Sequence, residues 1–329
     1  MAYQSPKGSI KRMSRNWHDF SLLSNCKTSK NMKKGRFLVL VGFLIATSFA
    51  YAQDYTFRVL ANKGANEIKS GDGWQPVKTG ASLKMGDELK VTENASIGLV
   101  HSSGKPLEVK KANTYKVADL AAQMSGGSSV LNKYTDFILS SNSAEAKKNR
   151  LSATGAVHRG LGIKVFLPNN QYASVFSNIV YVNWDNAEKG PYTVSFLNMF
   201  DDVLLKVETP ENKVSVDLND PKFAGESAIL VEIQSKTTGT KSDERYLIKK
   251  LSPGEREKIS SNFTDIMKEL NEETALNKVV LASFYEQNKL LIDAITAYEQ
   301  AIKLAPDNPT YQDYYEEFLL RNKLKVIKQ

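Results

Sequence analysis

The chain has 329 residues, of which 41% are hydrophobic and 24% are charged, a composition typical of a globular protein. Its formal net charge is +8, but residues 1–52 hold nine of the 44 Lys and Arg residues and one of the 36 Asp and Glu residues, which leaves 35 of each sign in residues 53–329. Charge therefore gives no argument for nucleic acid as a partner, and we expect none. The one cysteine is Cys26, so disulfides and cysteine-ligated zinc are excluded from residues 53–329.

An apolar segment near the N-terminus predicts export. Basic residues precede the apolar run 37–46, and small residues follow it. We interpret residues 32–52 as a signal peptide that signal peptidase recognises through Ala50 and Ala52 and cuts after Ala52. The apolar run is shorter than the ~20 residues that a spanning helix needs. We therefore expect no stable membrane span in the mature form, and a location in the periplasm or cell envelope.

Residues 1–31 form a polar segment that is unusual ahead of a signal peptide. Because Met32 directly precedes the basic residues, we interpret it as the translational start and residues 1–31 as an upstream extension. A cytoplasmic tail is the alternative. The 277 residues that remain when 52 of the 329 are removed suggest two or three domains.

Residues 53–120 predict a small, mostly antiparallel β domain. Short runs of alternating apolar and polar residues are separated by turns rich in Gly, Asp and Ser. The turn 102–105 lies between two such runs and predicts a hairpin. The strands are expected at 57–60, 82–85, 88–91, 96–101, 107–109 and 115–117.

The order of glycines and apolar residues in this module resembles the FecR-like domain family. The family's pattern is carried by the sequence GASLKMGDEL at 80–89, the small-residue strand 95–100 and the hairpin sequence SGKPLEV at 103–109. The resemblance implies an extracytoplasmic β domain of the bacterial cell envelope. It also implies a link to the family's best-known members, in which one membrane span joins such a domain to a cytoplasmic anti-sigma segment.

Residues 121–160 are expected to hold a short helix and a linker. Apolar residues between 129 and 140 repeat at helical spacing, which predicts an amphipathic helix docked on one of the β modules. Residues 142–154 are mostly small or charged, and this composition favours a surface linker.

Residues 161–251 predict a β-sandwich of the immunoglobulin or fibronectin type, because about seven short strands are typical of that architecture. Trp184 is followed by Tyr192 after a polar loop, and we interpret the two rings as core packing. The alternative is a tryptophan that stacks on carbohydrate. The strands are expected at 163–167, 178–184, 192–197, 203–208, 213–218, 228–233 and 245–249.

Residues 252–329 predict a helical module. Ser252 and Glu255 have the spacing of a capping box, with a proline at the first helical position. The segment that follows resembles one tetratricopeptide repeat, with flanking helices at 253–271 and 309–324. The residues that carry this resemblance are Leu281, Ala282, Tyr285, Ala294, Tyr298, Ala301 and Pro306.

Helix pairs of this kind usually present a concave surface to a peptide or a protein. The alternative is that a single repeat packs only against its own neighbours or forms a homodimer. The basic residues of the C-terminal tail, Arg321 among them, are interpreted as a solvated helix end. By position in the repeat, the groove contacts are expected at Leu276, Val279, Ser283, Glu286 and Gln287.

No constellation in the sequence indicates catalysis, a cofactor or a metal ion. His101 and His158 are the histidines of residues 53–329, and neither has a second histidine at metal-ligand spacing. The acidic pair Asp201 and Asp202 is interpreted as part of a turn, because neighbouring residues on a strand point to opposite faces. A glycan-processing enzyme would need a carboxylate pair in a cleft.

The predicted fold class is therefore multidomain, β and then α: a small antiparallel FecR-like domain, an immunoglobulin- or fibronectin-like β-sandwich and a C-terminal helical module similar to a tetratricopeptide repeat. We expect an exported, non-enzymatic interaction or scaffold protein of the cell envelope. Its partner is expected to be a protein, or else an envelope glycan, bound through the FecR-like and repeat-like modules. The alternative is a membrane-anchored signal transducer of the FecR anti-sigma type, which requires the apolar run to stay uncut.

Overall fold

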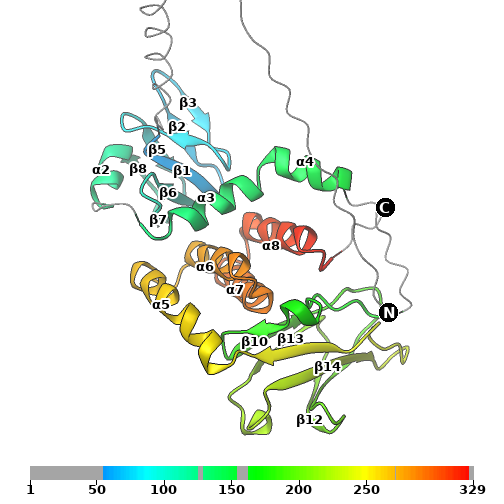
Figure 1. Ribbon diagram of the computed structural model, residues 1–329. Coiled ribbons are helices and arrows are strands. Elements are labelled where there is room, and N and C mark those ends of the chain that lie inside the picture. The colour runs from blue at the N-terminus through cyan, green and yellow to red at the C-terminus, as the bar shows by residue number, and fades with distance from the viewer. Residues whose placement is uncertain (1–54, 125–128, 154–161, 271, 326–329) are drawn as a thin grey trace, which may run out of the picture. The chain divides into compact units, whose positions relative to one another are not determined.

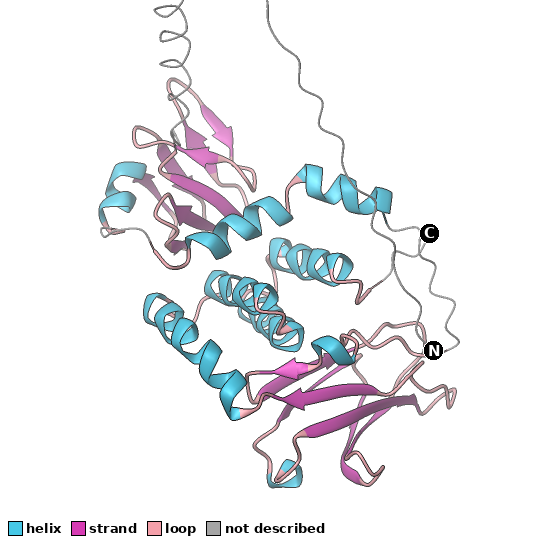
Figure 2. Cartoon of the chain, viewed as in Figure 1, coloured by secondary structure: helices cyan, strands magenta, loops and turns pink. Residues whose placement is uncertain are grey.

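The computed structural model describes residues 55–124, 129–153, 162–270 and 272–325 (Figure 1). All of them belong to one compact unit, Gln53–Gln329. A β-rich N-terminal region with several antiparallel sheets is followed by C-terminal helices, as the sequence predicts (Figure 2). The predicted upstream extension and signal peptide lie outside the described residues. Of the helices that are described, none is both long and apolar enough to cross a membrane.

The first β module contains two four-stranded sheets, with the strand orders β4-β1-β6-β7 and β3-β2-β5-β8. Their inner faces share a core in which Phe57, Leu89 and Leu99 have no exposed surface. The strands are β1 (Phe57–Lys63), β2 (Glu67–Lys69), β3 (Trp74–Pro76), β4 (Ser82–Leu83), β5 (Glu88–Val91), β6 (Ser96–His101), β7 (Pro106–Val109) and β8 (Asn113–Lys116). The predicted hairpin at 102–105 is confirmed, since β6 and β7 pair across it.

Two features of this module differ from the prediction. Strands β2 and β3 were not expected, because three residues are too few to show an alternating pattern. The last strand ends at Lys116, and Val117 begins the short helix α2 (Val117–Ala122) instead of continuing the strand.

The connector contains two helices, α3 (Asn132–Ser141) and α4 (Ala144–Ala153). The expected linker at 142–154 is therefore wrong for most of its length. Its Ala, Glu, Lys and Arg residues are strong helix formers, and the hydroxyl of Ser143 accepts a hydrogen bond from the amide of Ala146 at 3.2 Å, as in an N-cap. Low hydrophobicity was mistaken for a lack of structure.

The second β module combines a five-stranded sheet, ordered β12-β11-β14-β15-β9, with the two-stranded sheet β10-β13. Trp184 has no exposed surface and meets Tyr192 edge to face, with 5.2 Å between ring centroids, so it packs in the core as predicted. The expected strand at 163–167 forms only isolated bridges, at Ile163 and Val165. The strands are β9 (Ser174–Val175), β10 (Ile179–Asn183), β11 (Tyr192–Leu197), β12 (Val203–Thr209), β13 (Lys213–Asp217), β14 (Ala228–Ser235) and β15 (Tyr246–Lys250).

The C-terminal helices are α5 (Pro253–Glu269), α6 (Ala275–Gln287), α7 (Leu291–Leu304) and α8 (Pro309–Arg321). The predicted capping box is confirmed at the start of α5, where Ser252 and Glu255 each bond the other's backbone amide. Helices α6 and α7 pack closely, since Ala282, Ala294 and Ala301 have no exposed surface. Small side chains allow this approach, as the repeat-like spacing implies.

The helices share one hydrophobic core with both β modules. On the side of the first module, the hydroxyl of Tyr314 in α8 donates to the carbonyl of Leu60 in β1. Gly98 in β6 lies so near α6 that a Cβ atom at this position would be 3.3 Å from Leu276 Cδ1. On the side of the second module, α7 packs against β9 and β10. The described part of the chain is therefore a set of elements joined by continuous packing.

Candidate functional site

The expected groove of the α6–α7 pair is covered by elements of the chain itself, by helix α3 and, at Leu276, by strand β6. Leu276, Val279 and Ser283 have no exposed surface. The hydroxyl of Ser283 donates to the carbonyl of Tyr134 in α3 at 3.0 Å, and the rings of Tyr134 and Phe284 meet with 5.6 Å between centroids. Helix α3 thus docks on α6, and its first residue, Asn132, also lies against Gly104 in the β6–β7 turn of the first β module, so the predicted contact with a β module is present as well.

The remaining expected contacts also have partners within the chain. Gln287 is exposed, and its side-chain amide donates to the carbonyl of Lys133 at 3.5 Å. Glu286 is 5% exposed and accepts two hydrogen bonds of 2.7 Å from the guanidinium of Arg321 and one of 2.8 Å from Asn322. Contact of these residues with another protein stays a prediction. Ala50 and Ala52, the expected signal-peptidase residues, lie outside the described residues.

Arg321 is not the solvated helix end that the basic tail suggested. Its side chain is 13% exposed and lies beside the carboxylate of Glu286. Burial lowers the pKa of Arg321, but the hydrogen bonds and charges of Glu286 and Tyr298 together outweigh burial, so the pKa is raised overall. The guanidinium carbon is also 5.5 Å from the ring centroid of Phe137 in α3. This one side chain therefore links α8, α6 and α3.

A stripe of polar residues along α7 was missed by the sequence-based reasoning. Asp293, Thr296 and Glu299 follow one another at intervals of three, a spacing that places them on one side of the helix. All are buried, and all bond the second β module. Polar residues that recur every three positions in an otherwise apolar helix were the signal that could have revealed this contact.

Asp293 anchors the loop between β9 and β10. Its carboxylate has no exposed surface and accepts hydrogen bonds from the backbone amides of Phe176 at 2.8 Å and Ser177 at 2.6 Å. Burial raises the pKa of Asp293 to about 6, against the opposing effect of these two amides. One turn further along, the hydroxyl of Thr296 accepts from the amide of Tyr181 in β10 at 3.1 Å.

Glu299 makes the last of the three polar contacts between α7 and the second β module. Its carboxylate accepts from the side-chain amide of Asn183 and pairs with Lys213 at 3.3 Å. The same Asn183 amide lies 2.7 Å from the hydroxyl of Tyr315 in α8, and burial raises the pKa of that tyrosine well above its ordinary value. The cluster is a structural network that holds α7 and α8 against β10 and β13, in which the side-chain oxygen of Asn183 is buried without a hydrogen-bond partner.

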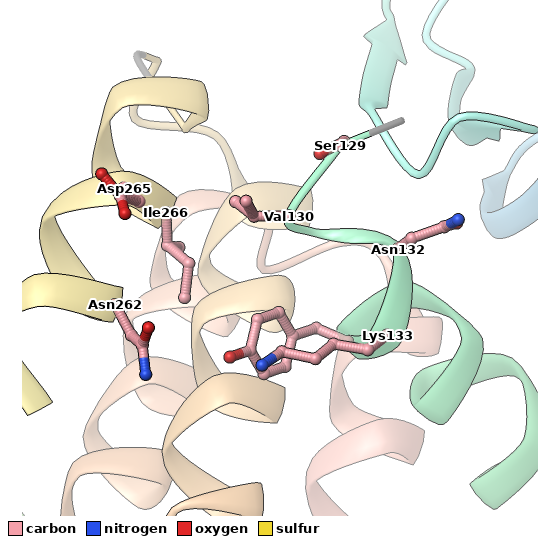
Figure 3. Close-up of a pocket in the computed structure, with 8 residues that line it drawn as sticks. Ser129, Val130, Asn132, Lys133, Asn262, Asp265 and Ile266 are labelled. Carbon is pink, nitrogen blue, oxygen red and sulfur yellow. The ribbon is translucent and has the colours of Figure 1, made fainter. Parts of the chain in front are cut away.

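An open pocket of about 340 Å³ lies between the start of α3 and helix α5 (Figure 3). Val130 and Ile266 supply apolar walls, whereas Lys133, Asn262 and Asp265 supply polar groups. The side chain of Lys133 extends from α3 toward α5, while that of Asn132 points away. The pocket is held in shape by Glu269 of α5, which accepts from the hydroxyl of Ser129 and, at 3.2 Å, from the amide of Val130.

The ammonium and the carboxylate of this pocket favour a ligand that can both accept and donate hydrogen bonds. The ammonium of Lys133 lies 4.8 Å from the ring centroid of Tyr134 and forms no ion pair with any described carboxylate. On the opposite wall Asp265 is exposed and pairs with Lys268 at 2.9 Å. A lysine without a carboxylate partner among the described residues can, together with the 46% exposed Val130 and the nearby Asp265, contact a polar chain of modest size.

The other polar residues singled out from the sequence have structural roles. Nδ1 of His101 lies 2.8 Å from the hydroxyl of Ser103 in the β6–β7 turn, and burial, followed by the charge of Lys105, lowers the pKa of His101. Asp201 lies in the turn between β11 and β12 with φ 71°, as the turn prediction requires. His158 is outside the described residues. Across the described ranges, no three His, Cys, Asp or Glu residues gather as a metal site.

Compared with known proteins, the chain matches no family model and no curated protein.

Proposed function

We propose that this protein is an exported, non-enzymatic interaction protein of the bacterial cell envelope, with a protein or an envelope polymer as its partner. The observation that carries the proposal is the pocket between α3 and α5. It is the place where Lys133, an unpaired cation among the described residues, extends over a concave surface that also offers an amide, a carboxylate and apolar walls. We infer that it holds a polar segment with a negatively charged group.

We also expect the three modules to have the architectures that their sequences resemble. Two four-stranded sheets with the glycine pattern described above agree with a FecR-like domain, and five strands over two agree with an immunoglobulin- or fibronectin-like sandwich. The α6–α7 pair agrees with a tetratricopeptide-like unit. In this interpretation the helix pair joins the two β modules, and the ligand binds at the rim, between α3 and α5, instead of in the groove.

Charge reversal in the pocket tests the binding proposal. Lys133→Glu should weaken co-sedimentation with purified envelope polymer, or cross-linking to envelope proteins, because it places a negative charge against an anionic group. Lys111→Glu is the matched control, since Lys111 is exposed in the first β module and its side chain makes no ion pair with a described residue. If the two variants bind as well as the unchanged protein, the pocket is not the binding site.

The start of the native chain tests export. N-terminal sequencing of the protein from its own cells should give Gln53, as expected for cleavage after Ala52. A chain that still carries residues 32–52 would contradict export by cleavage and would favour the membrane-anchored regulator of anti-sigma type.

A further inference from the structure

The outer strand β12 is the longest free sheet edge among the described strands. It has seven residues, Val203–Thr209, and pairs only with β11. Other edges are shorter or carry proline: β9 and β4 have two residues, β8 has four, β13 has five, and β3 and β7 carry Pro76 and Pro106. The edge of β10 is covered by Thr296 of α7. An unprotected edge of this length is a template for another strand.

Apolar side chains along this edge are partly exposed. Leu205 and Val207 pack against the core but are only partly buried, and Val203 is 49% exposed. The turn just before β12 carries Phe200, which is 86% exposed. That turn is rigid, because the side-chain oxygen of Asn198 accepts from the amides of Phe200 and Asp202, each at 2.9 Å. The edge and its turn thus present a fixed apolar surface that a further strand would cover.

The charges of β12 are complementary to those of a second, antiparallel copy of the same strand. Lys206 and Glu208 are exposed and lie on the same face of the strand, two residues apart. In an antiparallel pair of two identical strands centred on Val207, residue 206 of one strand faces residue 208 of the other. Opposite charges at directly facing positions stabilise a strand pair. Within one copy Glu208 is held by Lys236 at 2.9 Å, and a carboxylate has further lone pairs for a second cation.

We propose that β12 is a self-association edge, at which a second copy of this chain adds its own β12 antiparallel about a two-fold axis through Val207. The two-fold axis then makes two equivalent pairs between Lys206 of one copy and Glu208 of the other. Leu205 faces the partner's Thr209, and the five-stranded sheet continues across the interface. A lipid surface fits less well, because Asp201 and Asp202 directly follow Phe200 and would be repelled by anionic headgroups.

The charge-swap series tests this register in the purified protein by sedimentation velocity over a range of concentrations. The unchanged protein should form a dimer that dissociates on dilution. Lys206→Glu and Glu208→Lys should each weaken the dimer by about tenfold, because each makes two like-charge pairs. The double variant should restore it. A protein that is monomeric throughout, or a dimer that the single changes leave intact or the double change fails to restore, would overturn the proposal.

A cross-link provides a second measurement that does not depend on affinity. Residues 53–329 contain no cysteine, so Val207→Cys introduces a single thiol, and the two-fold register places it opposite its own copy. Facing residues of an antiparallel pair are within the Cα separation that a disulfide spans. Oxidation should give a covalent dimer with Val207→Cys and none with the control Ser215→Cys on β13. Equal cross-linking of both variants, or of neither, would reject this register.

Discussion

Breaking the buried ion pair between Glu286 and Arg321 should destabilise the whole helical region. Glu286→Gln keeps the shape of the side chain but leaves the guanidinium of Arg321, 13% exposed, without its carboxylate. The carboxylate accepts two hydrogen bonds of 2.7 Å from that guanidinium, whereas the amide of a glutamine has one oxygen that can accept. Removal of one partner of a buried pair costs about 3–5 kcal/mol, because the other charge stays buried and uncompensated. The free energy of unfolding should fall by that amount.

A double-mutant cycle separates the pair from the packing around it. Arg321→Met alone should also be costly, since Glu286 then keeps only the 2.8 Å bond from Asn322. Glu286→Gln combined with Arg321→Met leaves no buried charge, so its cost should be well below the sum of the single costs. Urea unfolding, followed by circular dichroism at constant pH and salt, measures the four stabilities.

The control is an exposed pair at the neighbouring helix. Lys268→Gln removes the 2.9 Å pair with Asp265, whose side chains are 69% and 52% exposed, and it should change stability by less than about 1 kcal/mol. A cost below about 1 kcal/mol for Glu286→Gln, or single costs that simply add in the double variant, would refute the idea that a desolvated ion pair holds α6, α8 and α3 together.

Three further outcomes are expected. The raised pKa of Asp293, about 6, means that the folded state binds this proton more tightly than the unfolded chain, so its contribution is complete below the unfolded pKa of 3.8 and is lost as the pH rises through about 6. Relative to Asp293→Asn, the unchanged protein should therefore lose ~2 kcal/mol of stability between pH 4 and pH 7, and a flat difference between the two urea titrations would contradict this. Gly104→Ala should lower the melting temperature more than Gly80→Ala, since both glycines have positive φ, 93° and 87°, but only at Gly104 would the Cβ meet Asn132, at 2.6 Å from its Cα atom. Equal shifts in a thermal scan would show that α3 does not pack on this turn. Trp184→Ala should cost about 3–5 kcal/mol by loss of a fully buried ring, and an exposed, ligand-stacking tryptophan would cost far less.

Features that depend on neighbouring residues in the chain were predictable. The capping box at Ser252 and Glu255 and the hairpin at 102–105 are set by local hydrogen bonds and turn chemistry, and both occur where expected. The alternating strands and the burial of Trp184 follow from the same kind of pattern. These patterns predict which side of an element is buried.

The same patterns do not predict what covers that side. Ser283 and Glu286 were assigned to an open groove, but α3 and Arg321 occupy their surroundings. Residues 144–153 have few large apolar residues, yet they form a helix with high helix propensity and a capping serine, and this helix also contacts α3 and α8. The local pattern indicates a solvated charge at Arg321, because the partner of this residue lies 35 positions earlier in the chain. Contacts between distant segments have no signature in a local window.

Helices α6 and α7 have both of their broad sides committed, one to α3 and the other to the small sheet of the second β module. Solenoid proteins grow in evolution by duplicating such a unit end to end, since each new copy lands on a vacant stacking surface. In this protein a duplicated helix pair would have no exposed side of α6 and α7 to stack on, and it would have to displace α3 or the small sheet. The ancestry of this chain should therefore show substitutions in its helix pair, but no gain or loss of whole units, and its relatives should keep the same helix number.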